Sequence, residues 1–149
     1  MPAHPKPMLY IDHNLRKMAN GRVPLLRVPG DHSYDVTKTV ACHANWLWGG
    51  KGLGKKCHDF LSVWGSNEAN MWLDQGSKEV KAARQAYWWA AYRKQLREWE
   101  KIIQDPWEPE RFKVSAGKAI NAFIDWVKEN SQLFDHDDWQ LEYKEREYV

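Results

Sequence analysis

Apolar residues recur at intervals of three or four along most of the chain, which is the spacing that places them on one face of an α-helix. The first predicted helix covers residues 33–48 and has Ser33 as its N-cap. A second helix is predicted to begin near Cys57, with a break at residues 65–67, where Ser66 or Asn67 can cap a new helix. The glycine-rich run between these helices, residues 49–56, predicts the turn of a helical hairpin.

The longest predicted helix extends from about Ser77 to Gln104, and its apolar residues form two adjacent stripes. It ends at Asp105, because a residue that precedes proline is driven out of helical geometry. A last helix is predicted from Ser115 to about Phe134. No stretch alternates apolar and polar residues for more than a few positions. The predicted fold class is therefore all-α, a small irregular bundle of about four helices that includes the hairpin and the long helix.

Both ends of the chain differ in composition from the predicted helical domain, residues 33–134. Residues 1–32 contain five prolines and two glycines, which predicts an extended arm that packs on a surface or on a partner. Residues 135–149 carry six acids and two bases, a net charge of −4, so the preceding residues carry +6 in a chain of net charge +2. This segment is predicted to be a peripheral acidic tail. A length of 149 residues suits one domain with such an arm and tail.

Ten tryptophans among 149 residues carry more indole surface than a core of this size is expected to absorb. Tryptophan and tyrosine concentrate in protein interfaces, where they fill pockets on the partner. Adjacent helical residues point about 100° apart, so Trp88 and Trp89 cannot both face one core. The predicted interface residues are Trp88, Trp89, Tyr92, Trp107 and Trp139.

The two cysteines, Cys42 and Cys57, are each followed by a histidine. Two free thiols in a reducing compartment are the simpler interpretation. The alternative is a disulfide across the predicted hairpin, where closing a loop of about fifteen residues would stabilise the fold by roughly 3 kcal/mol. A zinc site is not predicted, because adjacent ligands on a helix diverge, whereas zinc sites usually separate paired ligands by about two to four residues.

Two groups of basic residues suggest contact with an anion or a nucleic acid. Residues 49–55 match most of a phosphate-binding P-loop, but Lys56 stands where a hydroxyl residue is needed and a helical pattern precedes the loop. This run is therefore interpreted as a basic turn. The long predicted helix combines basic and aromatic side chains, as single-strand binding surfaces do, although glutamates interrupt its charge. The candidate contacts are Lys51, Lys55, Lys56, Lys94, Arg97 and Lys101.

His13, which follows Asp12, and the later His43 resemble the histidine arrangement of metal-dependent nucleases. The asparagine that orients the base in that arrangement has no counterpart at a matching position between them. Residues 135–138 read Asp-His-Asp-Asp, a run that could bind a divalent cation, but they lack the glycine and the distal glutamate of a calcium loop. No catalytic residue, metal ligand or cofactor is therefore predicted.

The predicted function is that of a non-enzymatic interaction protein, an accessory or scaffold subunit of a larger multiprotein assembly whose partners are other protein subunits. A mitochondrial membrane assembly such as a respiratory-chain complex is one candidate location, with the chain peripheral to the membrane. No apolar run approaches the roughly eighteen residues that a membrane span needs. The first alternative is a nucleic-acid-binding module that uses the basic aromatic helix. The second is a small metal-dependent hydrolase or nuclease.

Overall fold

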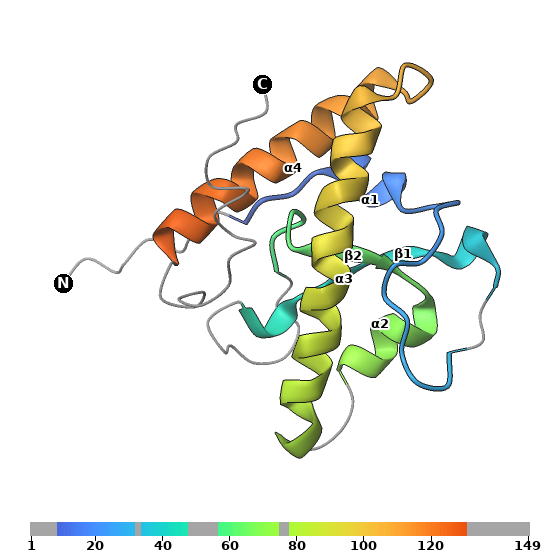
Figure 1. Cartoon of the computed structure of the whole chain (residues 1–149), viewed down its shortest axis with the longest axis vertical. Helices are drawn as coiled ribbons and strands as arrows, with labels where there is room; N and C mark the ends of the chain where they lie inside the picture. Colours follow the sequence, from blue (N-terminus) through green and yellow to red (C-terminus); the bar gives the residue numbers. More distant parts are fainter. Residues whose placement is uncertain (1–8, 32–33, 48–56, 75–77, 131–149) are drawn as a thin grey trace.

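The computed structural model describes residues 9–31, 34–47, 57–74 and 78–130. The described part of the chain combines α-helices with a two-stranded antiparallel sheet, so the predicted all-α class is wrong (Figure 1). In chain order, its elements are α1 (His13–Met18), η1 (Val36–Lys38), β1 (Val40–His43), η2 (Asn45–Leu47), β2 (Ser62–Gly65), α2 (Asn67–Leu73), α3 (Lys78–Gln104) and α4 (Glu110–Glu129).

The predicted helix at 33–48 is replaced by strand β1 with a 3₁₀ turn on each side. This stretch contains several β-branched residues, which fit a pleated strand better than a helix. Its partner β2 lies in the second predicted helix, in the register Val40↔Gly65 to His43↔Ser62. The predicted helical hairpin is therefore a β-hairpin, because pairing between these two segments outweighs their helical spacing.

The predicted helix start at Ser66 is confirmed by α2, but the segment before it is strand β2 and not the helix predicted from Cys57. The hydroxyl of Ser66 accepts a hydrogen bond from the backbone N–H of Ala69 at 3.0 Å and so caps this helix. Gly65 is required for close packing, since an added Cβ would lie 2.8 Å from Sγ of Cys42 and 3.2 Å from Cβ of Leu26. The helix α2 packs against both strands, so β1, β2 and α2 form one compact unit.

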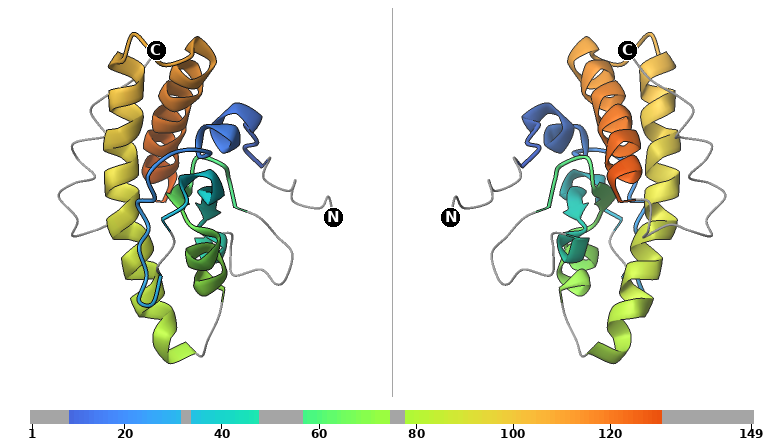
Figure 2. Two further views of the ribbon diagram at one scale, coloured as in Figure 1. Left: turned by 90° about the vertical axis from the view of Figure 1, so that its right-hand side faces the viewer. Right: turned by 90° about the vertical axis from the view of Figure 1, so that its left-hand side faces the viewer.

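The long helix α3 is confirmed almost to the residue, and both α4 and β2 pack against the same side of it (Figure 2). The helix α4 begins before the predicted Ser115, directly after Pro109, whose restricted φ suits a helix start. Buried residues of α3 and α4 form much of the core. The larger ones include Trp88, Tyr92, Leu96, Trp99, Ile120, Phe123, Ile124 and Val127.

The described part of the N-terminal segment contributes to this core. Leu15, Met18 and Leu26 are buried, and the backbone N–H groups of Leu25 and Leu26 both donate to the carbonyl of Trp64. A bidentate ion pair from Arg22 to Glu108 fastens the segment to the connection between α3 and α4. The segment therefore completes the fold, and α1 packs on α4. Within the described residues, no helix is long and apolar enough to cross a membrane.

Candidate functional site

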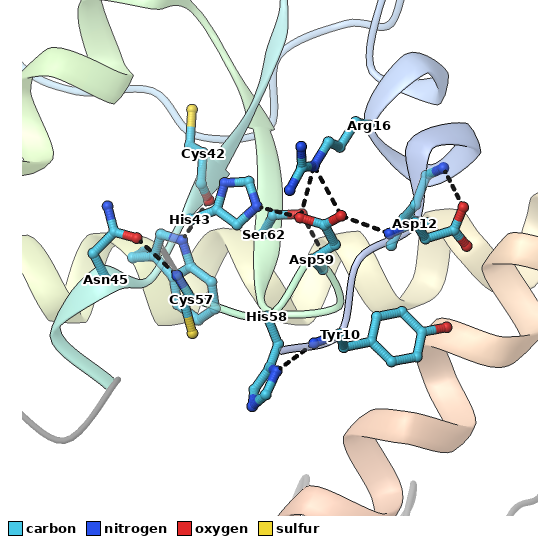
Figure 3. A network of polar contacts seen from close by, with 12 residues as sticks. Tyr10, Asp12, Arg16, Cys42, His43, Asn45, Cys57, His58, Asp59 and Ser62 are labelled. Carbon is cyan, nitrogen blue, oxygen red and sulfur yellow. Dashed lines mark hydrogen bonds and ion pairs between the residues drawn. The ribbon is translucent and has the colours of Figure 1, made fainter. Parts of the chain in front are cut away.

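The carboxylate of Asp59 is the centre of a polar network beside the β-hairpin (Figure 3). Its side chain is 1% exposed, yet it forms hydrogen bonds with three residues from two segments of the chain. Nε of Arg16 donates to both carboxylate oxygens at 2.9 and 2.8 Å, the backbone N–H of Asp12 donates to Oδ2 at 2.7 Å, and Nε2 of His43 lies 2.8 Å from Oδ1. A buried charge requires such partners.

Local structure positions each of these partners. The side chain of Asp12 caps α1 by accepting from the N–H of Leu15 at 3.1 Å, and Arg16 follows one turn later on the same helix. His43 is the last residue of β1 and pairs with Ser62 of β2. The hydroxyl of Ser62 donates to the carbonyl of Asp59 at 2.7 Å and so fixes the turn that carries the carboxylate.

The hydrogen bonds around Asp59 keep it ionised. Burial by itself would raise the pKa of this carboxyl, but the bonds from His43, from the Asp12 N–H and from Arg16 lower it further than burial raises it. The pKa of Asp59 is therefore below its ordinary value, and the side chain is an anion at neutral pH. An anionic carboxylate can only accept hydrogen bonds.

The charge on Asp59 fixes the proton of neutral His43. Because the carboxylate can only accept, Nε2 of the imidazole carries the hydrogen, and Nδ1 keeps a lone pair. Among the described residues, Nδ1 has no hydrogen-bond partner, and the His43 side chain is 14% exposed. This nitrogen can therefore accept a proton.

His43 lines an open surface hollow of about 580 Å³, which has the volume of a small-ligand site. Its walls come from α1 and the residues after it, from β1 and η2, and from α2. Most of its lining residues are polar or charged, although apolar atoms make up more of the lining surface. The lining residues are Arg16, Lys17, Asn20, Thr39, Val40, Ala41, His43, Asn45, Asn70 and Asp74.

The two cysteine thiols and the hydroxyl of Thr39 can be excluded as nucleophiles for a ligand in the hollow. Burial is the main cause that raises the pKa of both the Cys42 and the Cys57 thiol to about 12, so both are protonated and inert at neutral pH. The two cysteines are free thiols in the structure, as the simpler interpretation expected, and no disulfide joins them. Thr39, the hydroxyl residue of the hollow, is 3% exposed and donates to the carbonyl of Arg22 at 2.7 Å.

The structure distributes the predicted interface residues between the core and the surface. Trp88 and Tyr92 are fully buried, and Trp89 is partly buried in contact with both rings. Trp107 is 91% exposed on the connection between α3 and α4. Trp139 lies outside the described residues. Among the tryptophans that the structure describes, Trp107 is the exposed one.

The candidate anion contacts also fall into two groups. Lys94, Arg97 and Lys101 are exposed on α3, and Nζ of Lys101 pairs with Glu98 at 3.1 Å. The candidates on the glycine-rich run, Lys51, Lys55 and Lys56, lie outside the described residues. The structure therefore places the described candidates on a helix face rather than in the hollow.

The two histidines of the nuclease-like pattern are not brought into one site. His13 lines a second hollow with Tyr10, Glu110 and Lys118, whereas His43 lines the hollow described above. Over the described ranges, no group of three or more His, Cys, Asp or Glu side chains is placed to hold a metal ion. The acidic run at 135–138 lies outside those ranges.

Sequence reasoning missed Asp59 and Arg16. The spacing of Asp12 and Arg16 is that of a capped helix turn, but nothing in the sequence links them to a carboxylate 43 or more residues away.

His58, the residue before Asp59, anchors the N-terminal segment. Its Nδ1 accepts a hydrogen bond from the Tyr10 N–H at 2.9 Å. Burial lowers the pKa of His58 against the opposing effect of the Asp59 charge, so it serves as a neutral anchor.

Comparisons with protein-family models, with curated proteins and with solved structures found no match for this chain.

Proposed function

We propose that this chain is a hydrolase in which His43 acts as the general base that activates a water molecule. The observation that carries the proposal is the pair formed by His43 and the buried carboxylate of Asp59, joined at 2.8 Å beside an open polar hollow. In such a pair the carboxylate holds the imidazole in one tautomer and stabilises the cation that forms when the imidazole takes a proton. The remaining nitrogen then acts as the base.

Water is the nucleophile that suits this site best. Both thiols are buried and protonated, Thr39 is buried and hydrogen-bonded, and the hydroxyl of Ser62 donates to the backbone of Asp59. None of these groups is available to attack a substrate in the hollow. General-base assistance to a water molecule typically accelerates hydrolysis by roughly 10²–10⁴-fold.

The α2 wall of the hollow offers hard oxygen atoms. Asn70 and Asp74 lie one helical turn apart, and both line the hollow with His43. Amide and carboxylate oxygens are the ligands that Mg²⁺ and Ca²⁺ prefer. Activity is therefore assayed with Mg²⁺, with Mn²⁺ and with a chelator.

Replacing His43 by glutamine tests the proposal, because glutamine can still donate to Asp59 but cannot act as the base. The wild-type chain is assayed with p-nitrophenyl acetate, p-nitrophenyl phosphate, bis(p-nitrophenyl) phosphate, and single- and double-stranded DNA and RNA. On any substrate that the wild type hydrolyses, His43→Gln is expected to lower kcat by roughly 10²–10⁴-fold. Circular dichroism checks that the variant remains folded.

The matched control is His13→Gln, which changes the exposed histidine of the other hollow and should keep full activity. Equal rates for wild type and His43→Gln would contradict the proposal. An absence of turnover on the whole panel, with and without divalent cations, would contradict it as well.

The interaction function predicted from the sequence is a second candidate, and Trp107 is the observation that favours it. The backbone N–H of Trp107 donates to Oδ1 of Asp105 at 2.8 Å, which orders the turn that carries this exposed indole between two long helices. A preorganised aromatic side chain is a typical anchor in a protein interface. A stoichiometric protein subunit that co-purifies with the wild type should be lost from Trp107→Ala and retained by Tyr34→Ala, which removes another exposed aromatic ring. Retention of that subunit by Trp107→Ala would argue against this anchor.

A further inference from the structure

We infer that the hollow beside His43 binds the phosphate group of a phosphate-ester substrate, and that Arg16, Lys17 and Asn20 hold it. This inference rests on the proposed hydrolase function and names the substrate class of the same site. It starts from the observation that only one of the three guanidinium nitrogens of Arg16 donates to Asp59.

The buried carboxylate of Asp59 orients the guanidinium of Arg16 but does not accept from all of its N–H groups. Only Nε donates to Asp59, in a bond shared between the two carboxylate oxygens. Among the described residues, Nη1 and Nη2 have no hydrogen-bond partner, and the side chain remains 33% exposed and lines the hollow. The two Nη groups therefore form a fork held in place before a ligand arrives, and such a fork matches two oxygens of a phosphate.

Lys17 and Asn20 extend this wall of the hollow. Both side chains are exposed, and neither has a side-chain partner in the part of the chain that the structure describes. Asn45 adds an amide from a different direction, with its Oδ1 occupied by the backbone N–H of Cys57 at 3.1 Å, which leaves its NH₂ group as a donor. Asp74, on the opposite wall, is the one acidic residue among the lining residues, against two cations.

The number of these donors, and their placement on more than one element, favour phosphate over carboxylate. A carboxylate is planar and presents two oxygens, which the Arg16 fork alone would satisfy. A phosphate ester is tetrahedral and carries further oxygens, which can accept from Lys17 and from the asparagine amides on other walls. The ester would then lie beside Nδ1 of His43, so the anion-binding residues and the base face one reacting group.

The test uses inorganic phosphate as the probe, in binding measured by calorimetry and in competition with hydrolysis. Wild type is expected to bind phosphate, and phosphate is expected to inhibit competitively. Arg16→Lys keeps the charge but loses the fork, and should weaken phosphate binding by roughly tenfold or more, as expected for a hydrogen bond to a charged group. KM for phosphate esters should rise in this variant.

Arg16 also supports Asp59, so Lys17→Ala and Asn20→Ala provide variants that leave that network intact. Each is expected to weaken phosphate binding several-fold, whereas Lys94→Ala, which removes one lysine from the exposed face of α3, should not. Comparing p-nitrophenyl phosphate with bis(p-nitrophenyl) phosphate then distinguishes monoesters from diesters. An equal loss in Lys94→Ala would overturn the inference in favour of non-specific charge attraction.

The outcomes separate this inference from the proposed function. Loss of ester hydrolysis in His43→Gln, without any phosphate binding or inhibition, would overturn the inference and leave the hydrolase proposal standing. Phosphate binding that depends on Lys17 and Asn20, in a chain that hydrolyses nothing, would support the anion site and overturn the hydrolase proposal.

Discussion

Replacing Asp59 by alanine is expected to lower the free energy of unfolding by roughly 3 kcal/mol, the lower end of the range for breaking a buried ion pair, because Arg16 is partly exposed. The change removes the acceptor for Arg16, for the Asp12 N–H and for His43 at once. Urea denaturation at neutral pH, followed by circular dichroism, measures the loss.

The loss should depend on pH in a defined direction. The folded-state pKa of Asp59 lies below its unfolded value of 3.8, so the anion stabilises the fold fully above that value and loses this contribution as the pH falls through the folded-state pKa. The difference in stability between wild type and Asp59→Ala should therefore narrow below about pH 4. A constant difference from pH 7 to pH 3 would contradict the role assigned to this carboxylate.

The Asp59→Asn variant tests the effect of Asp59 on catalysis separately from its effect on the stability of the fold. An asparagine amide can turn its NH₂ group toward His43, which forces Nε2 to accept and moves the imidazole hydrogen onto Nδ1. The base is then in the wrong tautomer, so kcat should fall by up to roughly 10⁴-fold while much of the packing remains. A variant that is destabilised but fully active would show that the pair serves only the fold.

Replacing Trp88 by alanine is expected to destabilise the chain by roughly 3–5 kcal/mol. The indole is fully buried, stacks on Tyr92 at a centroid distance of 4.8 Å, and meets Trp46 and Trp89 edge to face. Its Nε1 donates to the carbonyl of Cys42 at 3.0 Å, which joins α3 to β1. Alanine therefore leaves both a cavity and an unsatisfied carbonyl.

The matched control is Trp107→Ala, which removes the same side chain from an exposed position and should change the unfolding free energy by less than about 0.5 kcal/mol. Thermal or urea denaturation of the two variants side by side gives the comparison. Similar losses at both positions would contradict the division between a core tryptophan and a surface tryptophan.

The long helix was predictable because its own residues determine it. Its apolar stripe repeats over many turns, and Asp105 with Pro106 stops it, so local information is sufficient. The hairpin was not predictable in this way. Each strand has four residues, too few for a convincing alternation, and their pairing depends on contacts between residues about twenty positions apart.

The candidate site was not predictable for the same reason, because it depends on contacts between distant parts of the chain. Arg16, His43 and Asp59 come from α1, β1 and the turn before β2, and they meet only because the hairpin and α1 pack together. The sequence pattern associates His43 with His13 rather than with a carboxylate. The premise behind the interaction hypothesis also changes, since the interior covers the described tryptophans to a greater extent than their number suggested, with Trp107 as the exception.

The link between Arg16 and Asp59 spans 43 residues, which has a consequence for synthesis on the ribosome. At about 5–20 residues per second, Arg16 leaves the ribosome roughly two to nine seconds before its carboxylate does. The six-residue α1 is too short to persist alone in water, so it waits as a nascent segment without a fixed conformation. The α1 segment is therefore fixed in its native position only after residues made seconds later have left the ribosome.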